Sequence, residues 1–108
     1  MSVVYALATP PAKSAICVFR VSGEGCLDAL EGLFEKKPKE HGFFCVRDMY
    51  LNNEIVDSVG LISFKGPKSY TGEDSFEVYG HGSLGVMGLM MDAFQSFGFE
   101  EAGPGEFT

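Results

Sequence analysis

The segment from residue 43 to residue 64 constrains the fold most, because it combines two strand patterns with a tight-turn signal. Phe43 to Leu51 and Ile55 to Phe64 are rich in β-branched and aromatic residues, as strands are. Asn52 and Asn53, which lie between them, tolerate the positive φ angles of a tight hairpin turn. The segment therefore predicts an antiparallel β-hairpin.

Two apolar stretches near the amino terminus predict the first two strands. Val3 to Ala8 is followed by a threonine and two prolines, which remove backbone donors and end a strand. Ala15 to Val21 is apolar and β-branched, and the alternation of a strand places Arg20 on the same face as Ile16 and Val18. Arg20 is therefore the odd member of an otherwise apolar face.

Two more strands are expected in the second half of the chain. Ser75 to Tyr79 alternates so that Glu77 and Tyr79 share one face, opposite Phe76. A last short strand is expected at Phe99 to Ala102. Together with the hairpin and the first two strands, these stretches predict a mixed β-sheet.

Two segments have the apolar spacing of helices. Glu24 to Lys37 predicts an amphipathic helix that ends before Pro38. Ser83 to Phe97 is apolar almost all round, which predicts a helix covered on two sides. We expect the sheet on one side and a second copy of the chain on the other, because a large apolar patch usually marks an interface. The expected order is ββαβββαβ, an α+β fold with a mixed β-sheet and two helices.

Length and composition fit one globular domain. The 108 residues are 45% hydrophobic and 21% charged, with 14 glycines for turns, so we expect a single domain over residues 1–108. The formal net charge of -7 argues against a protein that binds nucleic acid on its own. Affinity for a phosphate backbone comes mainly from clustered lysine and arginine.

The cysteines indicate neither a disulfide framework nor a metal site. Cys17, Cys26 and Cys45 form no C-x-x-C pair and are odd in number, which favours buried free thiols and a reducing cytoplasm. His41 and His81 lie at no zinc-like spacing from a cysteine pair, so no metal is expected. No stretch approaches the roughly 20 apolar residues of a membrane span. We therefore expect a cytoplasmic protein without membrane contact.

A glycine motif lies between the strand at residues 75–79 and the second helix. Gly80-His81-Gly82-Ser83-Leu84-Gly85 matches the G-x-G-x-x-G pattern, with Glu100 about twenty residues on, as in dinucleotide-binding folds. Glu77, however, interrupts the apolar run expected of a buried parallel strand. A tight turn with close helix packing, or a polar ligand near the helix amino terminus, are the stronger interpretations.

The loop at residues 66–74 predicts a polar turn on composition alone. It lacks the G-K-[ST] ending of a phosphate-binding P-loop. Glu73, Asp74 and Glu77 are close enough in sequence to form an acid and base pair, although such carboxylates are more often a solvated face or a cap. No pair of nucleophile and base stands out, so no catalytic residue is predicted.

Taken together, the motifs resemble the amino-terminal domain of the MnmE/TrmE family of tRNA-modification GTPases over essentially the whole chain. Four segments carry the resemblance in the family's order: Ala8-Thr9-Pro10-Pro11, Gly66-Pro67, Thr71-Gly72-Glu73-Asp74 and Gly80-His81-Gly82. Short glycine motifs recur by chance, whereas four segments in this order and at this spacing hardly ever do.

The resemblance implies a domain related to the folate-binding fold of the glycine-cleavage aminomethyltransferase, completed by homodimerisation. It implies a bound reduced folate, 5-formyl- or 5,10-methylene-tetrahydrofolate, as the source of a one-carbon unit. The whole protein of the family modifies the wobble uridine of certain tRNAs with a flavin-dependent partner protein. Because the helical and GTPase domains of the family are absent here, we expect a binding module cut from a longer protein, reaching tRNA only through the assembly and not catalysing alone.

The resemblance also implies that Arg20 and Glu77 contact the folate. Arg20 corresponds to the arginine of the family's R-[IV]-S-G segment, and Glu77 to the glutamate shortly after T-G-E-D. A carboxylate can accept two parallel hydrogen bonds from the adjacent N–H donors of a pterin ring. A guanidinium can bind a carboxylate or carbonyl of the ligand.

One loop departs from the family and leaves an alternative open. The family commonly has P-P-G-R-G-G where this chain has Pro10-Pro11-Ala12-Lys13-Ser14-Ala15, so glycines are lost in a loop expected near the ligand. The alternative is a stand-alone dimeric interaction domain with a non-functional folate site. A small folate-dependent methyl-transfer enzyme is a weaker third reading, which one-carbon turnover without added domains would identify.

Overall fold

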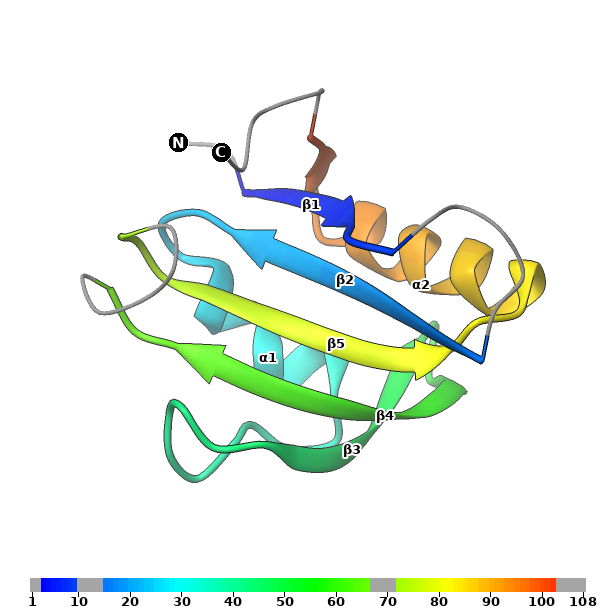
Figure 1. Ribbon diagram of the computed structural model, residues 1–108, viewed down its shortest axis with the longest axis horizontal. Coiled ribbons are helices and arrows are strands. Elements are labelled where there is room, and N and C mark those ends of the chain that lie inside the picture. Colours follow the sequence, from blue (N-terminus) through cyan, green and yellow to red (C-terminus); the bar gives the residue numbers. More distant parts are fainter. Residues whose placement is uncertain (1–2, 10–14, 67–71, 103–108) are drawn as a thin grey trace.

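The computed structural model describes residues 3–9, 15–66 and 72–102, which form one sheet with helices on one side (Figure 1). The six strands lie in the order β3-β4-β5-β2-β1-β6. They are β1 (Val4–Leu7), β2 (Ile16–Ser22), β3 (Cys45–Leu51), β4 (Glu54–Phe64), β5 (Ser75–His81) and β6 (Glu100–Glu101). The helices are the 3-10 helix η1 (Cys26–Ala29), α1 (Leu30–Leu33) and α2 (Leu84–Ser96).

The pairing of the strands confirms the predicted fold class and element order. β1 runs parallel to β6, whereas β1 with β2, β2 with β5, β4 with β5 and β3 with β4 are antiparallel. The sheet is therefore mixed. Strands and helices follow one another as expected for an α+β domain.

The core lies between the sheet and the helices. Phe19 from β2 and Tyr5 from β1 are fully buried against Phe94 of α2, with ring centroids 5.4 and 5.2 Å from that of Phe94. Because side chains alternate along a strand, the residues between these buried positions point to the opposite face of the sheet. In the described part of the chain both α-helices lie on one face only (Figure 1).

The predicted hairpin is confirmed. β3 and β4 pair in antiparallel register from Cys45↔Leu61 to Leu51↔Glu54. Asn52 and Asn53 in the turn have φ angles of 52° and 66°. These positive angles are the ones that asparagine tolerates better than most residues.

The predicted helix from Glu24 to Lys37 is wrong in its extent, since only η1 and α1 within it are helical. Phe34, which follows α1, has an extended backbone with φ -126° and ψ 158°. It forms a bridge with Met49 of β3, and its buried ring packs edge-on against Phe76 at a centroid distance of 6.2 Å. Burial of this ring beside the sheet ends the helix, and local spacing carries no information about that contact.

The second predicted helix is confirmed as α2. The Ser83 side chain accepts a hydrogen bond from the Val86 backbone N–H at 3.1 Å and caps the helix. The sheet covers one side of the helix, as expected. The other side is not covered in the single chain, where three large residues remain exposed: Leu84 at 64%, Leu89 at 44% and Phe97, the C-cap residue, at 43%. None of the described helices is long and apolar enough to cross a membrane.

Candidate ligand-binding face of the sheet

The fold brings Arg20 and Glu77 together on the sheet face turned away from the helices. Arg20 on β2 and Glu77 on β5 are direct cross-strand partners, although they are 57 positions apart in sequence. The Arg20 Nε donates to the Glu77 Oε2 at 2.8 Å. Their side chains are 43% and 18% exposed. The two predicted site residues therefore form one ion pair at the centre of the sheet.

Tyr79 completes this cluster and was not singled out as a site residue from the sequence. Its hydroxyl donates to the second carboxylate oxygen, Oε1 of Glu77, at 2.6 Å. This hydrogen bond, together with partial burial and the negative charge of Glu77, raises the pKa of the Tyr79 phenol. In the sequence, the one indication of this contact is that alternation places Glu77 and Tyr79 on the same face of one strand.

A shallow depression of about 280 Å³ lies beside the cluster on the same face. It is lined by Ala15, Ile16, Phe44, Ser58, Gly60, Tyr79, Gly80 and His81. The rings of Phe44 and Tyr79 are 5.7 Å apart between centroids, and the Phe44 ring lies where a Cβ at position 60 would be. The missing side chain at Gly60 thus leaves room for an aromatic wall beside Tyr79.

An aspartate and histidine pair lies at the end of β5, and of its two members His81 lines the depression. The Asp57 Oδ1 lies 2.7 Å from the His81 Nδ1, and the Asp57 Oδ2 accepts the His81 backbone N–H at 2.9 Å. The β4–β5 register runs from Phe64↔Ser75 to Gly60↔Tyr79, so the Asp57 carboxylate binds the backbone where that register ends. Sequence reasoning missed this pair because Asp57 and His81 are 24 positions apart.

Replacing Asp57 with alanine is expected to lower the free energy of unfolding by about 2 kcal/mol, because the His81 N–H loses its acceptor. Asp57→Asn keeps one carbonyl oxygen at this position, so its expected loss is about 1 kcal/mol. Urea denaturation of both variants measures the difference. Equal losses in the two variants, or none in Asp57→Ala, would show that the hydrogen bond from the His81 N–H to Asp57 does not stabilise the fold.

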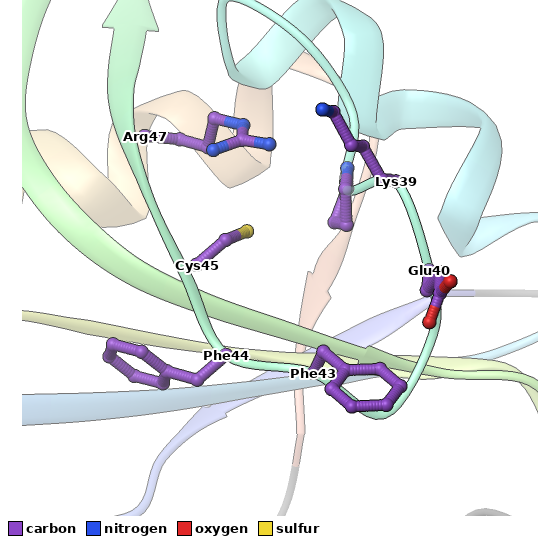
Figure 2. Close-up of a pocket in the computed structure, with 7 residues that line it drawn as sticks. Lys39, Glu40, Phe43, Phe44, Cys45 and Arg47 are labelled. Carbon is purple, nitrogen blue, oxygen red and sulfur yellow. The ribbon is translucent and has the colours of Figure 1, made fainter.

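A second cavity, of about 240 Å³, lies between β3 and the loop before it (Figure 2). Figure 2 shows Cys45 and Arg47 pointing from the strand toward the loop that carries Lys39. The Arg47 Nε donates to the Lys36 carbonyl at 3.2 Å, and its Nη1 donates to the Val46 carbonyl at 2.8 Å. The guanidinium therefore fastens this loop to the edge strand, which is a structural role.

The cysteines are free; Cys17 and Cys26 are buried as expected, whereas Cys45 is only half-buried. Burial, with the nearby Asp74 and Glu73 carboxylates, raises the pKa of the Cys26 thiol to about 12. Burial also raises the pKa of the Cys17 thiol. Both thiols are protonated near neutral pH and act as small hydrophobes. Within residues 3–9, 15–66 and 72–102, no group of three metal-ligating side chains comes together.

The surroundings of the glycine motif do not fit a dinucleotide-binding fold. β5, which runs into the motif, is antiparallel to both of its neighbours, whereas that fold needs a parallel strand. The motif instead spans the end of β5 and the start of α2, and only Gly82 and Ser83 lie between the two elements. In the loop before β5, at the other end of that strand, Asp74 Oδ1 accepts the Gly66 N–H at 3.1 Å, a capping role. Residues 67–71 of that loop, and the altered segment at 10–14, lie outside the described residues.

Comparison with known proteins gives consistent matches over this chain. The family profile described as "GTP-binding protein TrmE N-terminus" matches residues 3–108. The tRNA modification GTPase MnmE of Neorickettsia sennetsu is 39% identical over 110 positions, covering 100% of this chain and 20% of that protein. The MnmE proteins of Maricaulis maris and Thermus thermophilus are 40% and 38% identical, covering 97% of this chain and 24% and 26% of theirs. The chain thus spans about a fifth to a quarter of these curated relatives.

Proposed function

The chain belongs to the family of the TrmE amino-terminal domain, and on this basis we propose that it binds a reduced folate and dimerises within a tRNA-modification GTPase. The observation that carries the proposal is the Arg20–Glu77 ion pair beside the depression. The folate assignment comes from the family, and the chemistry of this cluster supports it.

The cluster has the groups that a pterin ring and its substituents require. The Glu77 carboxylate offers two oxygens to the paired N–H donors of the ring edge. The Arg20 guanidinium supplies planar donors for a carbonyl or carboxylate of the ligand. The rings of Phe44 and Tyr79 give the depression an aromatic wall against which a flat ring can pack. A 5-formyl- or 5,10-methylene-tetrahydrofolate fits this set of groups.

Exposed apolar residues support dimerisation. On the sheet, Ile16, Phe44 and Val46 are 55%, 60% and 61% exposed. On α2, Leu84 and Phe97 are also open to solvent in the single chain. These residues lie on two different faces of the chain, and exposed apolar residues of this size are enriched where proteins form interfaces. A second copy would complete a fold like that of the glycine-cleavage aminomethyltransferase.

The remaining parts of the proposal concern the whole protein. The net charge of -7 fits contact with tRNA through the assembly rather than through this domain. The flavin-dependent partner protein and a cytoplasmic setting belong to the same proposal.

One observation favours the alternative, an interaction domain with a non-functional folate site: both oxygens of Glu77 already have donors within the chain.

Calorimetric titration of the folded domain with 5-formyl-tetrahydrofolate tests the proposal, with the oligomeric state measured by light scattering at the same protein concentration. We expect saturable binding of one ligand per chain by a dimeric protein. Absence of binding by a folded dimer would favour the interaction domain. Binding by a protein that stays monomeric would retain the folate site and refute the dimer.

A further inference from the structure

The Glu77 carboxylate is already engaged on both oxygens in the absence of ligand. Arg20 donates to Oε2 at 2.8 Å, and Tyr79 donates to Oε1 at 2.6 Å. The Glu77 side chain is only 18% exposed. A carboxylate has room for about four hydrogen bonds, but a ligand edge with two parallel N–H donors must reach both oxygens at once and in one plane. With so little of the carboxylate open, an internal donor has to give way.

Tyr79 is the donor that stands between Glu77 and the depression. Its side chain lines the depression, and its cross-strand partner Gly60 forms part of the floor. Glu77 is the next residue of β5 on the same face, and it pairs with Ile62 beyond Gly60. A ring that enters from the depression therefore meets the Tyr79 hydroxyl before it reaches the carboxylate.

The two internal donors differ in what their displacement costs. Arg20 is charged and holds Glu77 in an ion pair, so its removal would leave a carboxylate without its counter-charge. Tyr79 is a neutral phenol whose hydroxyl can turn toward solvent or toward the ligand while its ring stays in place. The hydroxyl of Tyr79 is the donor that a ligand can replace at the lower cost.

We propose that the Tyr79 hydroxyl is an internal competitor for the ligand at Glu77, so that Tyr79 sets the affinity of the site and its selectivity for ligands with a paired N–H edge. The inference rests on the proposed folate function and adds a determinant of specificity to it. An N–H of the ligand takes the place of the Tyr79 hydroxyl at the Glu77 Oε1, whereas the Tyr79 ring remains beside Phe44 as part of the binding surface.

Tyr79→Phe tests the inference, because it removes the hydroxyl and keeps the ring. The variant is expected to bind 5-formyl-tetrahydrofolate, and pterin alone, about tenfold more tightly than the unaltered domain, since no internal hydrogen bond to a charged group has to break. p-Aminobenzoylglutamate, the folate tail that lacks the paired N–H edge, is expected to bind both proteins equally. Tyr50→Phe, which removes a hydroxyl from half-buried Tyr50 on β3, is the matched control and should change no affinity.

The outcomes separate this inference from the function on which it rests. If the unaltered domain binds the folate and Tyr79→Phe binds it equally or more weakly, the competitor role is refuted and the folate site stands. If neither folded protein binds any of the three ligands, both proposals fail. Tighter binding of p-aminobenzoylglutamate by Tyr79→Phe would also refute the inference, because the gain would then not depend on the Glu77 edge.

Discussion

Replacing Glu77 with glutamine is expected to weaken the binding of 5-formyl-tetrahydrofolate by about 30-fold or more. The amide has a single acceptor oxygen, so one of the two N–H donors of the pterin edge would meet an NH₂ group instead. The substitution also removes the charge that strengthens both hydrogen bonds and turns the 2.8 Å ion pair with Arg20 into, at most, a hydrogen bond to a neutral amide. Calorimetry on the folded variant measures the loss.

Glu54→Gln is the matched control for this substitution. Glu54 is an exposed residue at the start of β4, in the turn region of the hairpin, so the same change of charge there should leave the affinity within about twofold. The urea midpoint of each variant establishes that it is folded. Unaltered affinity in folded Glu77→Gln would remove Glu77 from the site and with it the chemical basis of the folate assignment.

The largest effect on stability is expected from Phe94→Ala, at about 3–5 kcal/mol. The Phe94 ring is fully buried and contacts the rings of Tyr5, Phe19 and Phe99 at centroid distances of 5.2, 5.4 and 6.4 Å. Its removal would leave a cavity where α2 meets the sheet. Domains of this size are stable by about 5–15 kcal/mol, so urea denaturation should show a greatly lowered midpoint.

Phe97→Ala provides the comparison on the same helix end. Phe97 is 43% exposed and its ring is 6.1 Å from that of Phe99, so its truncation is expected to cost about 1 kcal/mol. A loss for Phe94→Ala no greater than that for Phe97→Ala would show that the core between α2 and the sheet is not organised as described.

Local patterns were sufficient where the structure depends on neighbours in sequence. The hairpin was predictable because Asn52 and Asn53 mark the turn, and strand alternation placed Arg20 and Glu77 on faces opposite to buried residues. The extent of the first helix was not predictable, because the helix ends where Phe34 is buried beside Phe76, and this contact joins distant segments of the chain.

The candidate site shows the same division. Strand alternation is sufficient to place Arg20, Glu77 and Tyr79 on particular strand faces. The contact between Arg20 and Glu77, however, depends on the register of β2 against β5. Nothing local specifies that register. The contact between Asp57 and His81 likewise depends on β4 lying beside β5, and no sequence motif predicts it.

The placement of β2 beside β5 has a consequence for how the protein folds. Arg20 and Glu77 are 57 positions apart, and the chain between them contains α1 and the whole β3–β4 hairpin. Closing so long a loop is entropically costly until the intervening segments are compact. Non-local strand pairing of this kind is intrinsically slow. A partly folded chain in which β2 and β5 are not yet paired therefore lacks the Arg20–Glu77 ion pair on which the proposed ligand site depends.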